Sequence, residues 1–256
     1  MDIGEIAERW SLTLGEPYPD DHASTVLPAV SRVHGDVVLK LTTRDYEARD
    51  EADGLRFWDG DGAIRLLDDA ADERTIALLL ERCDPGTPLR SRPEPEQDEV
   101  LASMLHRLWR EPPPGTAFRP LAEMCARWAD EHDARAVPLD PAIERDGMHL
   151  FRTLPDSAPR HVLLCTDLHA GNIVAAAREP WLMIDPTPFV GDPTYDALRH
   201  LLNCDERLAT APLELVGRMA DLLELDRERL RLWLFARAVQ QSDVPLLRDV
   251  ARAVAP

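Results

Sequence analysis

The segment Val162–Asp185, which reads VLLCTDLHAGNIVAAAREPWLMID, decides how the rest of the chain is interpreted. The apolar runs VLL at its start and WLMI at its end are both typical of short buried strands. Asp167 follows the first run closely, and Asp185 follows the second run directly. A tight polar loop is expected between the two runs, and it carries Asn172 five residues after Asp167.

This order of two carboxylates and an amide matches what phosphoryl transfer from a nucleotide requires. Asp167 would orient or deprotonate the attacking hydroxyl group, while the amide oxygen of Asn172 and the carboxylate of Asp185 would hold Mg²⁺ against the phosphates. The segment therefore predicts a nucleotide-dependent kinase, and the rest of the chain tests that hypothesis.

Composition limits the class of protein. The 256 residues suit one large domain or two small lobes, and the net charge of −18 argues against nucleic acid as a partner because phosphate binding needs clustered Lys and Arg. The same charge would attract a cationic small substrate, although solubility alone is a sufficient reason for it. No apolar run approaches the length that spans a bilayer, and MDIGEIAERW resembles no export signal. Four scattered cysteines without a CxxC pair are expected to be reduced thiols in a cytoplasm. A monomer or weak dimer is predicted.

Lys40 is the single lysine among 29 basic residues, and it lies in the apolar run DVVLKL. Arginine and lysine are not equivalent where a compact charge must fit between phosphates and a glutamate. Survival of one lysine by chance is the alternative. Its position on a strand shortly before a helix favours the kinase interpretation.

The expected helix over residues 45–58 offers two glutamates, Glu47 and Glu51, as partners of Lys40. Glu51 lies one turn before Leu55, on the side that is expected to face the sheet. A solvated position is the commoner fate of a helical glutamate. Glu51 is nevertheless favoured as the partner.

The remaining N-terminal segment reads as a small sheet. Strands are expected over residues 23–30, 36–42, 63–67 and 75–80, with a polar loop over 68–74 and a short helix over 2–10. The turn over residues 20–25 would cover the phosphates, but it has no glycine, so backbone amides and the hydroxyls of Ser24 or Thr25 would have to serve. The break after the last strand suggests an adenine-binding hinge that offers backbone groups of Glu81 and Cys83.

Helical periodicity dominates beyond Leu89. Helices are expected over residues 95–110, 118–133, 141–154, 193–202, 213–225, 226–241 and 244–254. Asp140-Pro141 and Asp192-Pro193 each place an N-cap aspartate before a proline at the first helical position. The sequence thus predicts an α+β, bilobal plan with a small β-rich N-terminal lobe, residues 1–83, and a larger, mostly helical C-terminal lobe, residues 84–256.

The motifs together resemble those of the aminoglycoside phosphotransferase family. They are Lys40, Glu51, CTDLHAGN at 165–172, IDP at 184–186 and GDPTYD at 191–196, and the surrounding sequence is most similar to the streptomycin 6-kinase and hydroxyurea phosphotransferase branch. The resemblance extends from about Trp10 to Gln241. It implies a protein-kinase-like fold, ATP and Mg²⁺ as cofactors, and a small-molecule hydroxyl as acceptor: an aminoglycoside-type antibiotic or hydroxyurea.

The resemblance also implies a role for each motif residue. Asp167 would be the catalytic base, Asn172 and Asp185 the Mg²⁺ ligands, and Lys40 the phosphate contact held by Glu51. Asp196 would support the catalytic loop rather than touch substrate.

Two departures from the family pattern concern the catalytic loop, where His-Gly-Asp is replaced by Cys165-Thr166-Asp167. A thiol replaces a histidine that packs within the loop, and Thr166 restricts the backbone where glycine would not. Together with the glycine-free phosphate turn, these changes leave a degenerate, nucleotide-binding protein with little transfer activity as an alternative.

A metallohydrolase is a second alternative, with ligands drawn from five residues of the central region: His161, Cys165, Asp167, His169 and Asp185. Their spacing matches no standard zinc pattern and gives Lys40 no role. His169 is therefore expected to be a loop-packing residue.

Overall fold

The computed structural model describes residues 1–19, 24–135 and 139–256. It divides into two compact units whose sequences alternate. Unit 1 comprises Met1–Ser91 and Asn172–Thr187, and unit 2 comprises Arg92–Gly171 and Pro188–Pro256. The lobe boundary predicted between residues 83 and 84 stays a prediction.

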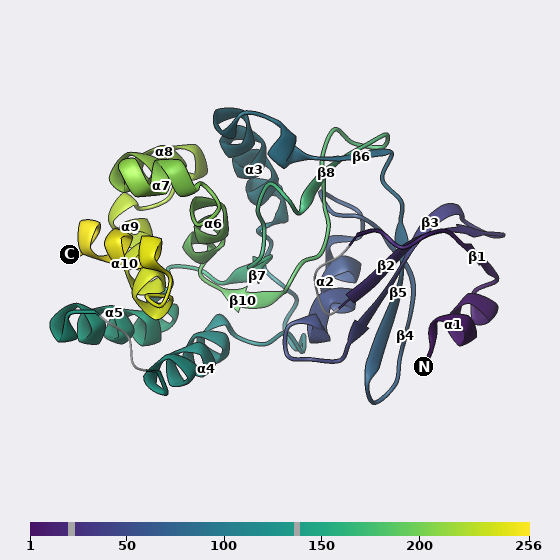
Figure 1. The fold of residues 1–256 in the computed structure, drawn as a ribbon, viewed down its shortest axis with the longest axis horizontal. Helices are drawn as coiled ribbons and strands as arrows, with labels where there is room; N and C mark the ends of the chain where they lie inside the picture. The colour runs from purple at the N-terminus through teal and green to yellow at the C-terminus, as the bar shows by residue number, and fades with distance from the viewer. Residues whose placement is uncertain (20–23, 136–138) are drawn as a thin grey trace. The chain divides into compact units, whose positions relative to one another are not determined.

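An antiparallel sheet with strand order β1-β2-β3-β5-β4 forms the centre of unit 1 (Figure 1). Its strands are β1 (Leu12–Leu14), β2 (Ser24–Ser31), β3 (Gly35–Thr43), β4 (Leu66–Ala71) and β5 (Thr75–Glu81). The helices of this unit are α1 (Ile3–Arg9) and α2 (Glu51–Trp58), with 3-10 turns η1 (Ala48–Asp50) and η2 (Leu89–Ser91). The predicted hairpin of β2 and β3 is confirmed, with Val26 opposite Lys40.

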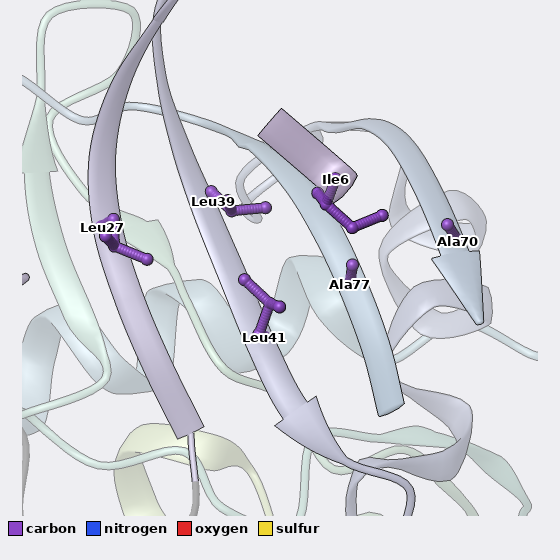
Figure 2. Close-up of a cluster of buried hydrophobic side chains, with 6 residues drawn as sticks. All are labelled: Ile6, Leu27, Leu39, Leu41, Ala70 and Ala77. Atoms are coloured by element: carbon purple, nitrogen blue, oxygen red, sulfur yellow. The ribbon is translucent and has the colours of Figure 1, made fainter. Parts of the chain in front are cut away.

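Successive side chains of β3 alternate between the two faces of the sheet, and this alternation places Lys40. Leu39 and Leu41 point to one face, where they pack with Ile6 of α1, as Figure 2 shows. The cluster comprises Ile6, Leu27, Leu39, Leu41, Ala70 and Ala77. Lys40, between two residues of that face, points to the opposite one.

A smaller sheet completes unit 1, with strand order β6-β8-β9. Its strands are β6 (Pro85–Pro88), β8 (Ile173–Ala176) and β9 (Leu182–Met183). Both pairings are antiparallel, and Ile173 lies opposite Met183. Met183 also forms a bridge with Ala63, so this small sheet is attached to the segment that precedes β4.

Unit 2 is mostly helical. Its helices are α3 (Glu94–Leu108), α4 (Leu121–Asp133), α5 (Pro141–Thr153), α6 (Pro193–Leu201), α7 (Asp205–Thr210), α8 (Pro212–Leu223), α9 (Arg227–Gln240) and α10 (Pro245–Ala253), with the 3-10 turn η3 (Pro155–Ser157). Strands β7 (Val162–Leu164) and β10 (Phe189–Gly191) pair antiparallel. The two predicted aspartate caps are confirmed: Asp140 accepts from the N–H of Ala142, and Asp192 from that of Thr194.

Several element predictions were wrong in detail. The helix expected over 45–58 is a 3-10 turn followed by α2, because Asp45 accepts the N–H groups of Glu47 and Ala48 in a local turn. The strand expected over 63–67 is β4 at Leu66–Ala71, so the predicted loop 68–74 is largely strand.

Four strands, β1, β6, β8 and β10, and one α-helix, α7, were not predicted at all. The apolar residues of β8 follow Asn172 inside what was read as a polar loop, and the six-residue helix α7 is short for its pattern to show. No helix within the described residues is both long and apolar enough to cross a membrane.

Candidate active site

Lys40 and Glu51 form a buried ion pair on the α2 face of the sheet. Nζ of Lys40 lies 2.8 Å from Oε1 and 2.7 Å from Oε2 of Glu51, and both residues are buried. Glu51 begins α2 and is buried, whereas Glu47 precedes η1 and is exposed. Of the two glutamates considered, Glu51 is therefore the partner of the single lysine.

Asp185 is the second carboxylate that Lys40 contacts, through Oδ1. Burial by itself would lower the pKa of Lys40, but Glu51 and Asp185 together raise it, so the ammonium stays charged. Burial raises the pKa of Glu51 to about 7, against the opposing effect of Lys40. Half of the Asp185 side chain is exposed, so its carboxylate also reaches solvent. Unit 1 thus holds one cation between a buried and an exposed anion.

Asn172 lies beside Asp185 because β8 and β9 pair. The N–H of Ile184 donates to the carbonyl of Asn172 at 2.9 Å, so Asn172 and Asp185 lie at the same end of the two-strand ladder. Asp185 has a φ of +55°, a left-handed conformation that Asp tolerates better than most residues. The backbone therefore places Asn172 and Asp185 side by side at this end of the ladder.

Asp167 lies in unit 2, in the loop that follows β7. Asp196 of α6 fixes the backbone just before it, accepting from the N–H of Cys165 at 3.0 Å and from that of Thr166 at 2.7 Å. Trp109 donates its indole N–H to the same carboxylate at 3.0 Å. Asp196 is fully buried, which raises its pKa to about 6 against these three hydrogen bonds. The side chain of Asp196 thus supports the loop by binding the backbone of Cys165 and Thr166.

Thr166 adopts a left-handed conformation, with a φ of +48°. This conformation costs roughly 1–2 kcal/mol for a residue with a Cβ, and a β-branched residue is an outlier there. The family pattern has glycine at this position, so threonine was expected to restrict the backbone. The loop nevertheless keeps the left-handed conformation that glycine adopts easily.

Replacing Thr166 by glycine should therefore stabilise the protein. We expect Thr166→Gly to raise the free energy of unfolding by about 0.5–1 kcal/mol, since the strain relieved exceeds the entropy that glycine adds to the unfolded chain. Urea unfolding measures this difference. Thr153→Gly, at the end of α5, is the matched control and should destabilise; a loss of stability in both variants would contradict the strain.

Arg199, also on α6, was not predicted to take part in the site. Its Nε lies 2.5 Å from Oδ1 of Asp167, and both side chains are about one third exposed. The available signal was helical spacing, because Arg199 follows Asp196 by three residues and so shares its face of α6.

Ser24 and Thr25 begin β2, and their strand partners are Thr42 and Leu41. They therefore lie within two residues of the position opposite Lys40. The remainder of the predicted phosphate turn, residues 20–23, lies outside the described residues. A phosphate contact by either hydroxyl stays a prediction.

Glu81 and Cys83 lie at and after the end of β5. The N–H of Glu81 donates to the carbonyl of Arg65 at 2.9 Å, so an adenine contact through that group would have to break an existing bond. The carboxylate of Glu81 is held by Arg178 through two bonds of 2.9 Å. Arg178, which sequence reasoning missed because the partner is 97 residues away, also donates to the carbonyls of Gly60 and Ala63. The adenine contacts of Glu81 and Cys83 stay predictions.

The five residues of the metallohydrolase hypothesis do not form a ligand cluster. Among the described residues, the one group with ligand atoms close enough for a metal is Asp98, His200 and Cys204, which shares no member with them. In that group Arg207 and Arg218 already hold the carboxylate of Asp98. Nδ1 of His169 accepts the N–H of Gly171 at 3.0 Å, as expected of a loop-packing residue.

Three features define the class of protein-kinase-like phosphotransferases. They are a β-sheet lobe with a buried Lys–Glu pair, a helical lobe, and a loop whose aspartate is supported by another aspartate that is buried. Comparison of the sequence with known families gives the particular one. The profile of the aminoglycoside/hydroxyurea antibiotic resistance kinases matches residues 9–247, and the chain belongs to this family.

Curated relatives agree with the family assignment. A hydroxyurea phosphotransferase of Kitasatospora aureofaciens is 37% identical over 93% of this chain and 70% of its own length. A streptomycin 6-kinase of Streptomyces griseus is 36% identical over 99% of this chain and 85% of its own length. The chain is thus a phosphotransferase that uses ATP and acts on small-molecule hydroxyl groups, and nothing in these comparisons supports the degenerate alternative.

Solved structures confirm the predicted fold class. The aminoglycoside phosphotransferase APH(3'')-Id of Streptomyces rimosus, solved with ADP and streptomycin, gives a TM-score of 0.60 at 18% identity over 92% of both chains. Amicoumacin kinase hAmiN, solved with AMP-PNP, Ca²⁺ and its substrate, gives 0.65 at 12% identity over 100% of this chain and 95% of its own. At such identities the likeness concerns the fold alone.

Proposed function

We propose that this protein transfers the γ-phosphate of ATP to a hydroxyl group of an aminoglycoside-type antibiotic related to streptomycin, or of hydroxyurea. Family membership supports the reaction class, and the names of the relatives suggest these two acceptors. The observation that carries the proposal is the single lysine, buried against Glu51 and in contact with Asp185.

Asn172 and Asp185 suit a Mg²⁺ ion, because their side chains offer the oxygen ligands that this hard cation prefers. Their position at one end of the β8–β9 ladder supports this assignment, as does the exposure of the Asp185 carboxylate. When bound, Mg²⁺ would neutralise charge on the β- and γ-phosphates. Lys40, whose charge is maintained by two carboxylates, would contact the phosphates beside it.

Asp167 would act as the base. In the proposed reaction the acceptor oxygen forms a bond to the γ-phosphorus, and the bond from that phosphorus to the oxygen bridging to the β-phosphate breaks. The hydroxyl proton passes to the carboxylate of Asp167, and ADP leaves. Positioning and electrostatic stabilisation supply most of the rate, since the protein forms no covalent bond.

A screen for ADP release tests the proposal. The protein is incubated with ATP and each of streptomycin, other aminoglycosides and hydroxyurea, with and without EDTA. We expect one acceptor to raise ADP release well above the rate with water alone, and EDTA to abolish that increase. If no acceptor raised ADP release, the proposed acceptor class would be contradicted. If ADP release stayed fully stimulated in EDTA, the proposed metal would be contradicted.

The pH dependence of kcat should show the titration of Asp196. Protonation below about pH 6 removes an acceptor from the bonds to the Cys165 and Thr166 N–H groups, and protonation of Glu51 below about pH 7 weakens its ion pair with Lys40. The slope of log kcat against pH should therefore approach about two below pH 6 and about one in Asp196→Asn. An identical acid limb in both proteins would exclude Asp196 as a titrating support.

The contribution of Asp196 to stability falls as the pH rises, whereas its contribution to kcat increases. Because its pKa is raised from 3.8 to about 6 on folding, its contribution is fully present below pH 3.8 and is lost as the pH rises through about 6. The ionised carboxylate is thus needed by the loop although burial disfavours it.

A further inference from the structure

Helix α6 holds the Asp167 loop at two points. Asp196 binds the backbone N–H groups of Cys165 and Thr166, and Arg199, three residues later on the same face of the helix, lies against the Asp167 side chain. The first contact fixes the main chain just before the aspartate. The second fixes the carboxylate itself, so the two contacts do different work.

The contact between Arg199 and Asp167 is an ion pair. Nε of Arg199 is shielded from solvent and makes no well-aligned hydrogen bond, and Oδ1 of Asp167 lies 2.5 Å from it. Because both side chains are about one third exposed, such a pair contributes little to the stability of the fold. The consequence of the ion pair is therefore the orientation of the Asp167 carboxylate, which lies toward Arg199.

Arg237 of α9 favours this orientation of Arg199. It is buried, and it contacts neutral groups: Oε1 of Gln240, the hydroxyl of Tyr195, and the ring of Trp128, whose centroid lies 4.6 Å from its guanidinium carbon. Burial first, and then the charge of Arg199, lower the pKa of Arg237. The two guanidinium groups repel each other, and Asp167 offers Arg199 the compensating charge.

We propose that Arg199 is a positioning residue for phosphoryl transfer, holding the Asp167 carboxylate in the orientation that receives the acceptor's proton. Its charge also competes with any cationic group of the acceptor for that carboxylate. This inference rests on the proposed role of Asp167 as base. Arg199 would thus both align the base and weaken the binding of cationic acceptors.

Two consequences separate this role from a structural one. Loss of Arg199 should lower kcat while the KM for ATP stays constant, since the nucleotide contacts proposed above lie in unit 1. It should also strengthen binding of a cationic acceptor, because the carboxylate is then available to it, and leave binding of a neutral acceptor unchanged. Streptomycin, with its guanidinium groups, and uncharged hydroxyurea are the matched probes.

Kinetics with Arg199→Gln and Arg199→Lys test the proposal. We expect Arg199→Gln to lower kcat about 10²-fold with an unchanged KM for ATP, and Arg199→Lys to recover most of that loss. By calorimetry, Arg199→Gln should bind streptomycin about threefold more tightly and hydroxyurea as before. Arg252→Gln, which removes an exposed pair with Asp249 on α10, is the control and should match the parent.

Three results would overturn the inference while the parent remains an active kinase. They are full kcat in Arg199→Gln, equal losses in the Gln and Lys variants, and unchanged affinity for streptomycin. Failure of the proposed function would look different, since the parent itself would phosphorylate neither acceptor. The ion pair is judged in either case by the ¹⁵Nε resonance of Arg199, identified by its loss in Arg199→Lys: it should shift in Asp167→Asn, and an unshifted resonance would refute the pair.

Discussion

Asp167→Asn is expected to lower kcat by about 10²–10⁴-fold while the Kd for ATP stays within about threefold of the parent value. The amide keeps the shape of the carboxylate but cannot take the acceptor's proton, and it also loses the charge that pairs with Arg199. Product formation measures kcat, and calorimetry with a non-hydrolysable ATP analogue measures nucleotide binding.

Asp249→Asn is the matched control for this variant, because it removes an exposed carboxylate that pairs with an arginine of its own helix. It should have the activity of the parent. Equal activity of Asp167→Asn and the parent would remove Asp167 from the role of base. Loss of both transfer and nucleotide binding would instead indicate a structural defect.

Lys40→Met is expected to have the largest effect on stability, lowering the free energy of unfolding by about 3–5 kcal/mol. The substitution leaves the carboxylate of Glu51 buried without its cation. It also removes the proposed phosphate contact, so transfer should be lost. Urea unfolding and product formation measure the two effects.

The double variant Lys40→Met, Glu51→Leu separates the two effects of Lys40→Met. It removes the buried charge as well as its partner, so stability should recover while activity does not. Two results would show that the pair is not buried as described. One is a double variant as unstable as Lys40→Met, and the other is no loss of stability in Lys40→Met itself. Arg252→Met is a control for removing a cation from an exposed pair.

The stability of Lys40→Met should also fall as the pH rises. Without Lys40 the opposition to the raised pKa of Glu51 is gone, so the folded state holds a proton that the unfolded state releases above about pH 4.5. The loss of stability should therefore be larger at pH 8 than at pH 5.5. The opposite trend would mean that Glu51 is stabilised in its charged form by other groups.

Features that depend on local pattern could be predicted from the sequence. The apolar run around Lys40 placed this residue on a strand shortly before a helix, and the spacing of α2 favoured Glu51 over Glu47. Aspartate followed by proline marked the starts of α5 and α6. The family motifs gave the fold class, which the solved structures confirm.

Features that depend on tertiary contacts were missed. The segment of β8 is apolar but short, and it becomes a strand because β6 and β9 offer it partners. Arg178 and Arg199 are ordinary surface-type residues in sequence, and their partners are set by the fold. For Thr166 the family glycine signalled a restricted backbone, but the left-handed conformation itself is seen only in the fold, where Asp196 binds the N–H groups of the loop.

The central claim is that this chain moves the γ-phosphate of ATP to an acceptor hydroxyl and uses Asp167 to do so. The most direct measurement follows γ-labelled ATP with streptomycin and with hydroxyurea, comparing the parent with Asp167→Asn. We expect the label to appear in one acceptor in equal amount to the ADP formed, and to be absent from that acceptor with the variant. Label released as free phosphate, or transferred equally by both proteins, would contradict the claim.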